Sequence, residues 1–228
     1  MLIKENVSLR DFSTFKAGGP ASFFAEPASI AELEECLSFA KSNSIPSLII
    51  GAGSNILVSD KGYEGLVIRF GSNFSKLSIE ESEKNCIVTA KAGTMLSAFG
   101  RFCMEHSLQG AEFCCGIPGS MGGAVFMNAG AYGREMKDIV SSVTYLDENK
   151  EVKTISNKEC AFGYRTSFFE KEKKPIVLEA KMTLERGDKA QIEGYVNELK
   201  AKRINSQPVD VPSAGSTFKR PEGYYVGA

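Results

Sequence analysis

The stretch Ser47-Leu48-Ile49-Ile50-Gly51-Ala52-Gly53-Ser54-Asn55 joins a short apolar run to a glycine turn. An apolar run of four residues that is opened by Pro46 and closed by Gly51 predicts a buried strand. Glycines directly after such a strand let backbone amides approach a phosphate, and Ser54 and Asn55 add side-chain donors. A tight structural turn would explain the segment equally well. It has neither the Lys-Ser/Thr pair of a Walker loop nor the third glycine of a Rossmann fingerprint.

A second glycine-rich stretch runs from Gly116 to Gly133. It reads Gly116-Ile117-Pro118-Gly119-Ser120-Met121-Gly122-Gly123-Ala124 and continues into Asn128-Ala129-Gly130-Ala131-Tyr132-Gly133. Glycine loses much conformational freedom on folding, so this density needs a reason, such as close approach of the backbone to a ligand. Two such segments indicate a ligand with more than one polar contact region, as a dinucleotide has. A set of tight turns is the alternative.

Two further segments carry chemistry. Phe162-Gly163-Tyr164-Arg165-Thr166-Ser167 places an arginine among aromatic residues, where its guanidinium can bind a carboxylate or phosphate with two hydrogen bonds. A structural ion pair is the alternative. Ser213-Ala214-Gly215-Ser216-Thr217-Phe218-Lys219 places a hydroxyl at a glycine turn near a lysine; a helix cap or loop serine is the alternative there.

The pattern of elements predicts three zones. Apolar residues spaced three and four apart, capped by Ser29, predict a helix over residues 28–42, and together with strands at 47–50 and 66–70 it forms an α/β unit. The second zone reads as α+β with a largely antiparallel or mixed sheet. A charged helix near 190–203 opens the third zone. The further expected elements are strands at 77–80, 86–90, 140–146, 151–155 and 176–184 and a helix at 95–106.

Composition excludes several classes of function. The 228 residues carry 27 Lys+Arg against 28 Asp+Glu, so the basic surplus of a dedicated nucleic-acid binder is missing. Apolar runs are too short to span a membrane, and no secretory signal precedes them, so we expect a cytoplasmic protein. The six cysteines then predict small buried hydrophobes rather than disulfides. One histidine and no Cys-x-x-Cys argue against a zinc site.

Taken in order, these segments resemble the UDP-N-acetylenolpyruvoylglucosamine reductase family, the flavoenzymes that make UDP-N-acetylmuramate for bacterial peptidoglycan. Ser13-Thr14-Phe15-Lys16-Ala17-Gly18-Gly19-Pro20-Ala21 is similar to that family's opening, and residues 51–60 are similar to its flavin pyrophosphate loop. Gly116-Ile117-Pro118-Gly119 is similar to its second flavin segment. Tyr164-Arg165 and Gly215-Ser216-Thr217-Phe218-Lys219 are similar to its two active-site signatures. Only residues 166–174 separate Tyr164-Arg165 from the following strand, which suggests the shorter subtype.

The resemblance implies an α+β FAD-binding fold of the vanillyl-alcohol-oxidase (PCMH) type. Two α+β subdomains, expected at 1–71 and 72–187, clasp FAD, and 188–228 begin a substrate domain. The chain stops at Ala228, before the glutamate that the family uses in catalysis, so we expect a C-terminally truncated enzyme that is weakly active or inactive. The oligomeric state stays open.

The resemblance also implies a reaction and its residues. NADPH reduces FAD, and the flavin then passes hydride to C3 of the enolpyruvyl ether of a UDP-sugar. Arg165 is expected to bind the substrate carboxylate and stabilise developing charge, while Ser216 protonates C2. Tyr132, Tyr164 and Lys219 are expected to contact the substrate. Those expected to contact FAD are Gly51, Ala52, Gly53, Ser54, Asn55, Ile56, Gly116, Ile117, Pro118, Gly119, Gly122, Gly123, Ala124 and Ile176.

Two alternatives stay open from the residues. An oxidase of the same fold, acting on an alcohol or hydroxy acid, would explain both glycine segments but not Tyr164-Arg165 or Gly215-Ser216. A non-catalytic flavin-binding module is the other, and bound flavin without NADPH oxidation would favour it.

Overall fold

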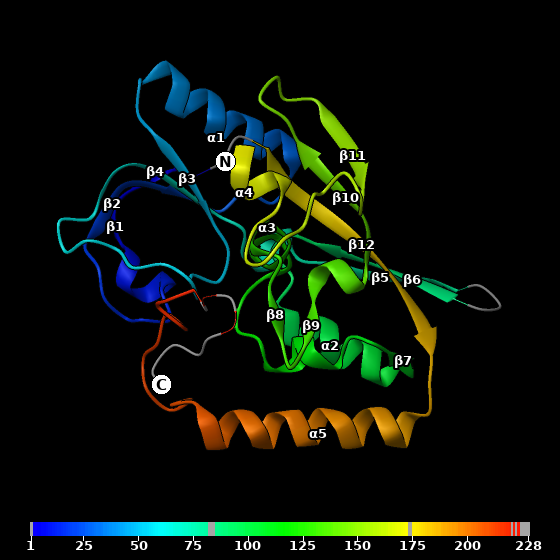
Figure 1. Ribbon diagram of the computed structural model, residues 1–228. Coiled ribbons are helices and arrows are strands. Elements are labelled where there is room, and N and C mark those ends of the chain that lie inside the picture. Colours follow the sequence, from blue (N-terminus) through cyan, green and yellow to red (C-terminus); the bar gives the residue numbers. More distant parts are fainter. Residues whose placement is uncertain (1, 82–84, 173–174, 220, 222, 224–228) are drawn as a thin grey trace.

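The computed structural model describes residues 2–81, 85–172, 175–219, 221 and 223. A four-stranded sheet forms the first part of the fold (Figure 1). Its strand order is β1-β2-β4-β3, with β2, β4 and β3 parallel and β1 antiparallel to β2. Because β3 and β4 are parallel, the glycine loop leaves the sheet at its carboxyl edge. The strands are β1 (Lys4–Ser8), β2 (Pro20–Ala25), β3 (Ser47–Ile50) and β4 (Tyr63–Arg69).

Helix α1 (Ile30–Ser42) connects β2 to β3, as the three-and-four spacing predicts. Ser29 caps it, and its hydroxyl accepts a 3.2 Å hydrogen bond from the backbone N–H of Glu32. Leu33 and Ala40 are buried against the core. Strands β1 and β2 were not predicted from the sequence pattern.

A second, antiparallel sheet carries the middle of the chain. Its order is β11-β10-β12-β6-β5, with β7 paired to the end of β12. The antiparallel prediction for this zone is confirmed. The strands are β5 (Leu77–Glu81), β6 (Asn85–Lys91), β7 (Leu108–Gln109), β10 (Val140–Leu146), β11 (Val152–Ser156) and β12 (Ile176–Arg186).

The glycine-dense stretch contains a helix, α3 (Met121–Met127), which the sequence pattern did not predict. Gly122 explains the difference. Its N–H donates a 2.9 Å hydrogen bond to the carbonyl of Ala92, and a Cβ at Gly122 would lie 2.9 Å from the Ala92 side chain. Close packing on the end of β6 therefore stabilises a helix that glycine by itself disfavours.

Shorter elements complete the middle of the chain. Helix α2 (Leu96–Glu105) packs against the turn that precedes the second glycine segment. The others are α4 (Phe168–Glu172), the hairpin β8 (Gly130–Ala131) with β9 (Arg134–Glu135), and the 3₁₀ helices η1 (Leu9–Phe12), η2 (Ser72–Phe74), η3 (Glu112–Gly116) and η4 (Met136–Asp138).

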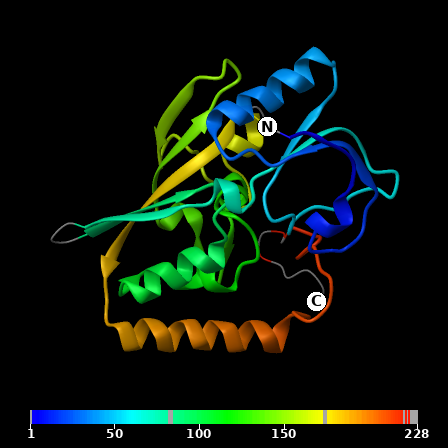
Figure 2. The same cartoon turned by 180° about the vertical axis from the view of Figure 1, so that it is seen from behind.

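Helix α5 (Lys189–Ser206) lies along one side of the molecule, below α2 in Figure 1 and again in the view from behind (Figure 2). It contacts η3 and α2, with Ile192 and Leu199 buried. After α5 the chain returns to the first sheet, where Ser213 and Thr14 are hydrogen bonded. The third zone of the chain therefore contacts the first zone.

One large apolar core runs through both sheets and includes Leu33 of α1, Phe99 of α2 and Met182 of β12. A smaller cluster beside it contains Leu9 and Phe24. The expected domain boundaries at 71/72 and 187/188 stay predictions. Residue 1 and residues 220, 222 and 224–228, which belong to the first and third expected domains, lie outside the described residues.

Candidate active site

The glycines of the loop after β3 lie in close contact with other parts of the chain. A Cβ at Gly51 would overlap the hydroxyl of Ser120, the residue that precedes α3. Gly53 has φ +66°, and a Cβ there would overlap the backbone carbonyl of Phe12. Glycine is therefore required at Gly53 by backbone crowding and backbone conformation, whereas a side chain at Gly51 would force the Ser120 side chain to move.

The two glycine segments meet. Ser54 Oγ donates a 2.9 Å hydrogen bond to the carbonyl of Pro118. Gly119, at φ +143°, lies so close that a Cβ would be 3.2 Å from Ser54 Oγ. Residues that are 64 positions apart in the sequence thus form one continuous backbone surface.

This surface fits the phosphate-bearing part of a dinucleotide. Within the described part of the chain, the N–H groups of Ala52, Gly53, Ser54 and Asn55 donate no hydrogen bond, and neither does that of Gly119. Backbone N–H groups require a partner, and successive unpaired ones at a glycine turn bind anions. The residues present therefore match FAD, whose diphosphate supplies such a partner.

Thr14 joins a third segment to this surface. Its N–H donates to the carbonyl of Gly53 at 3.1 Å, and its hydroxyl donates to the carbonyl of Ser213 at 2.6 Å. Ser213 N–H donates back to the carbonyl of Thr14 at 3.1 Å. Ser216 follows on the same segment and is exposed, as is Lys219, which has no ion pair among the described residues.

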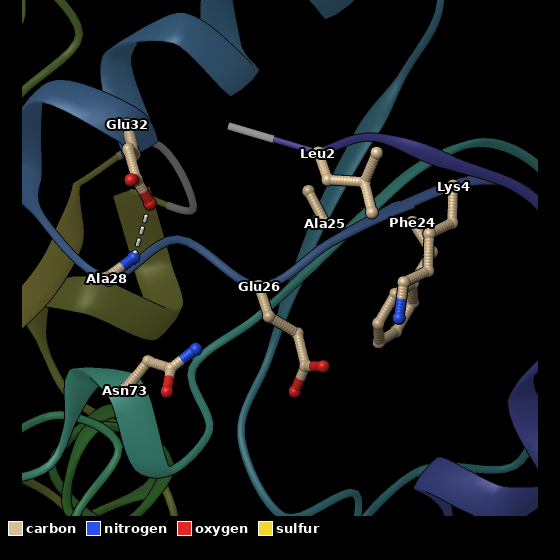
Figure 3. Close-up of a pocket in the computed structure, with 8 residues that line it drawn as sticks. All are labelled: Leu2, Lys4, Phe24, Ala25, Glu26, Ala28, Glu32 and Asn73. Carbon is tan, nitrogen blue, oxygen red and sulfur yellow. Dashed lines mark hydrogen bonds between the residues drawn. The ribbon is translucent and has the colours of Figure 1, made fainter.

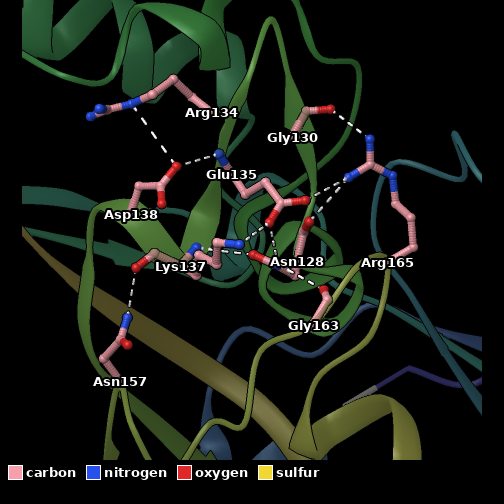
Figure 4. Close-up of polar contacts among 9 residues, drawn as sticks. All are labelled: Asn128, Gly130, Arg134, Glu135, Lys137, Asp138, Asn157, Gly163 and Arg165. Carbon is pink, nitrogen blue, oxygen red and sulfur yellow. Dashed lines mark hydrogen bonds and ion pairs between the residues drawn. The ribbon is translucent and has the colours of Figure 1, made fainter. Parts of the chain in front are cut away.

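Arg165 lies at the tip of a tight turn. Gly163 and Thr166 exchange backbone hydrogen bonds of 3.0 and 3.3 Å, and Arg165 has a left-handed φ of +54°. Its Nη2 donates to the carbonyl of Gly130 at 2.8 Å (Figure 4). A left-handed arginine is strained, and such strain persists only where surrounding contacts hold it, commonly at functional sites.

Two tyrosines flank this region. The Arg165 guanidinium lies 5.2 Å from the centre of the Tyr164 ring, in a cation–π arrangement, and Tyr164 is half exposed. Tyr132 has φ +56°, and its hydroxyl donates to the carbonyl of Leu199 in α5 at 3.2 Å. Tyr132 therefore connects the second glycine segment to α5.

The structure brings the other predicted FAD residues together less completely. Ile56 and Ile117 are half-buried beside the two loops, and Gly123 is exposed on α3. Gly122 and Ala124 pack into the core instead. Ile176 begins β12 opposite Leu146 and contacts the core, with no hydrogen bond to either loop among the described residues.

Sequence reasoning missed a cluster of side chains next to Arg165. Asn128, Glu135 and Lys137 form a network with the guanidinium that Figure 4 shows. Asn128 ends α3 in the left-handed conformation, with φ +44°. Glycine is the usual residue at such a helix end, and asparagine is also found there. This preference of asparagine for helix ends is the sequence signal that could have identified Asn128. A hydrogen bond to Glu135 raises the pKa of the Lys137 ammonium, which stays charged.

Three thiols lie behind the second glycine segment. Burial raises the pKa of Cys103, Cys114 and Cys115, and neighbouring thiols raise those of Cys103 and Cys114 further. All six cysteines are free, and five of them are buried, all but Cys115. Since the thiolate is the reactive form, these side chains serve packing and not nucleophilic chemistry.

A pocket of about 320 Å³ opens elsewhere, at the edge of the first sheet (Figure 3). The Glu32 carboxylate accepts a 2.7 Å hydrogen bond from Ala28 N–H beside it. None of the predicted site residues lines it; its walls are Leu2, Lys4, Phe24, Ala25, Glu26, Ala28, Glu32 and Asn73. Across the described ranges, no group of three or more His, Cys, Asp or Glu residues could hold a metal ion, and no helix is long and apolar enough to cross a bilayer.

The fold and the paired glycine loops define a flavin-binding protein. Residues 21–156 match the family described as FAD binding domain. The crystal structure of cholesterol oxidase from B. sterolicum superposes with a TM-score of 0.60 over 81% of this chain and 38% of that one, at 13% identity, which shows the shared fold. The expected FAD-binding PCMH-type α+β fold is confirmed.

Closer relatives name the family. The UDP-N-acetylenolpyruvoylglucosamine reductase of Agathobacter rectalis is 45% identical over 96% of this chain and 72% of its own length. That of Caldanaerobacter subterraneus subsp. tengcongensis is 45% identical over 97% and 72%. The crystal structure of the Thermus caldophilus reductase has a TM-score of 0.83 and 30% identity, covering 99% of this chain and 78% of that one. The chain belongs to the UDP-N-acetylenolpyruvoylglucosamine reductase family and is an FAD-dependent oxidoreductase of peptidoglycan precursor synthesis.

Proposed function

We propose that this chain reduces the enolpyruvyl ether of UDP-N-acetylglucosamine to UDP-N-acetylmuramate, with NADPH as the hydride source. Bound FAD would supply the redox chemistry, accepting hydride and passing it on. The net change adds hydride to C3 and a proton to C2 of the enolpyruvyl group, so the double bond becomes a CH–CH₃ unit. The protein must therefore bind an anion, stabilise charge and deliver one proton.

The observation that supports this proposal most strongly is the placement of Arg165. Its guanidinium is held at a strained turn, about two-thirds buried, with a side chain that is 32% exposed. Hydride addition at C3 pushes negative charge toward C2 and the adjoining carboxylate. A guanidinium that is already in place lowers the energy of that charge as it develops.

Ser216 is our proposed proton donor to C2. The contact between Thr14 and Ser213 brings its segment beside the Gly51–Asn55 loop, where a Cβ on Gly215 would lie 4.0 Å from the Ser54 carbonyl. A hydroxyl next to the flavin surface has the position that a proton donor needs.

The remaining predicted contacts surround these two. We assign Tyr132, Tyr164 and Lys219 to the substrate, because all three are exposed and the tyrosines flank the arginine turn. We assign the backbone of Gly51, Ala52, Gly53, Ser54, Asn55, Ile56, Gly116, Ile117, Pro118 and Gly119 to FAD, together with Gly122, Gly123, Ala124 and Ile176.

The cytoplasm is the proposed location, because UDP-sugars and NADPH are formed there and all six cysteines are reduced. Family membership argues against both alternatives raised by the sequence, the oxidase of similar fold and the non-catalytic flavin module.

An anaerobic absorbance titration tests the proposal. Purified flavoprotein is mixed with one equivalent of NADPH and then with the enolpyruvyl substrate. We expect flavin absorbance to bleach with NADPH and to return when substrate is added. Bleaching without return would contradict the proposed substrate, and failure to bleach would contradict the proposed hydride donor.

A further inference from the structure

The Arg165 guanidinium is held on one side by three acceptors. Nη1 donates to the carbonyl of Asn128 at 3.3 Å and lies 3.7 Å from Glu135 Oε1, while Nη2 donates to the carbonyl of Gly130 at 2.8 Å. No described acceptor is bound to Nε. These contacts therefore orient the guanidinium, and its remaining N–H donors are available to an anion.

Glu135 is itself held in place. Its Oε2 accepts a 3.1 Å hydrogen bond from Asn128 Nδ2 and lies 2.8 Å from the Lys137 ammonium. Its own N–H donates to the carboxylate of Asp138 at 2.8 Å. With one oxygen occupied by Asn128 and Lys137, the other is left to face Arg165 (Figure 4).

Asn128 contacts both the turn that carries Arg165 and the Arg165 guanidinium. It is fully buried, and its Nδ2 donates a 2.8 Å hydrogen bond to the carbonyl of Gly163, which begins the arginine turn. Its backbone carbonyl accepts a hydrogen bond from the guanidinium at the end of the Arg165 side chain. Its Oδ1 accepts from Lys137 N–H at 2.9 Å, so the side-chain amide is satisfied on both sides.

The charges of the cluster favour an anion. Arg165 and Lys137 supply two positive charges, and Glu135 supplies one negative charge. The neighbouring charges of Arg134 and Asp138 cancel each other. A surplus of one positive charge remains, so the carboxylate orients the arginine without cancelling its attraction for a substrate anion. Partial burial strengthens that attraction relative to water.

We propose that Glu135 and Asn128 are positioning residues for Arg165, which act on the enolpyruvyl substrate only through the guanidinium. The inference rests on the proposed function of Arg165. Neither side chain is assigned a contact with substrate or flavin. Their loss should therefore change the step in which charge develops on the substrate, and should leave flavin binding and NADPH oxidation as they are.

The test uses the flavin-loaded enzyme and Glu135→Gln, which keeps the shape and removes the charge. We expect flavin content and the rate of bleaching by NADPH to stay within about twofold of the parent, while reoxidation by substrate slows about tenfold or more. Calorimetry on the oxidised enzyme should show substrate binding that is weaker as well. Asn128→Asp, which loses the donor to both Gly163 and Glu135 and places a second carboxylate beside Glu135, should have the same signature, with thermal unfolding recorded alongside.

A double-mutant cycle separates positioning from general structural damage. If Glu135 acts through Arg165, adding Glu135→Gln to Arg165→Met should change reoxidation by less than about twofold. Arg134→Met is the matched control. Arg134 shares the short strand β9 with Glu135, but its guanidinium lies 4.0 Å from the Asp138 carboxylate. We expect this variant to leave both half-reactions unchanged.

Two results would overturn the inference: unchanged reoxidation in Glu135→Gln, or effects that add fully in the cycle. A parent enzyme that NADPH bleaches but substrate does not reoxidise would instead refute the proposed function. In that case the calorimetric binding data would still report on Arg165.

Discussion

The hydroxyl of Thr14 donates a 2.6 Å hydrogen bond to the carbonyl of Ser213, across 199 positions of sequence. The backbone N–H of Ser213 donates in return to the carbonyl of Thr14 at 3.1 Å. Because Thr14 N–H also binds Gly53, one residue fastens the Ser216 segment to the first glycine loop. The proposed proton donor and the proposed flavin surface are thus connected through a single residue, Thr14.

Replacing Thr14 by valine keeps its shape and removes that donor. A hydrogen bond of this kind contributes about 1 kcal/mol, so we expect residues 207–219 to open about fivefold more often. Hydrogen exchange of their amides measures this directly. Thr14→Ser, which retains the hydroxyl, is the control. Equal exchange in the valine variant and the parent would show that the other contacts hold the segment.

Gly53→Ala should abolish most flavin binding. The new Cβ would overlap the Phe12 carbonyl, and the left-handed backbone adds a cost of about 1–2 kcal/mol. We expect bound flavin per chain after desalting to fall about tenfold.

Gly133→Ala is the matched control for crowding. Gly133 has φ +80°, but a Cβ there meets nothing within 4 Å. It carries the backbone cost alone, so we expect flavin content close to the parent. If both variants lost flavin equally, backbone strain and not the tight fit of the loop would be the cause.

Ser54→Ala removes the side-chain bridge to Pro118. We expect the dissociation constant for FAD to rise roughly two- to tenfold, the effect of one lost hydrogen bond between the two loops. Fluorescence quenching of FAD on titration with protein measures this constant. Ser78→Ala, an exposed serine on β5, should leave the constant unchanged. A Ser54 variant that binds like the parent would mean that the loops hold their spacing without the bridge.

Alkaline pH should destabilise the fold through its buried thiols. Burial raises the pKa of Cys36 from 9.0 to about 11 and that of Cys160 to about 12. In the unfolded chain both thiols ionise near pH 9. Their contribution to the free energy of unfolding is therefore complete below pH 9 and is lost as the pH rises toward 11–12. Each thiol lowers the free energy of unfolding by up to about 1.4 kcal/mol per pH unit in that window.

Urea denaturation at pH 8, 9 and 10.5 follows this loss. Cys36→Ala and Cys160→Ala should each have a shallower slope of unfolding free energy against pH, whatever their stability at pH 8. A slope that neither variant changes would assign the alkaline loss to other groups.

Local pattern predicted much of the fold. The three-and-four spacing and Ser29 predicted α1, and the apolar run predicted β3, because both signals lie within a few residues. Strand β10 begins and ends as expected. The α3 helix was missed, since contact with Ala92 outweighs the cost of its glycines.

The candidate site was predictable in its residue types and not in its connections. Arg165 stood out among aromatic residues, yet nothing near it in sequence indicates Asn128 or Glu135. Those residues lie more than 25 positions away, and their meeting depends on how α3 and the β8–β9 hairpin pack. Side-chain networks of this kind arise from tertiary structure, which periodicity does not encode.

We propose that the loops at Gly51–Asn55 and Gly116–Gly119 together hold one FAD. The most direct test is to incubate the purified chain with excess FAD, desalt it and compare flavin absorbance with protein concentration. We expect about one flavin per chain, and a sharp decrease in this ratio in Gly53→Ala. Flavin that elutes entirely free from the parent protein would contradict the proposal.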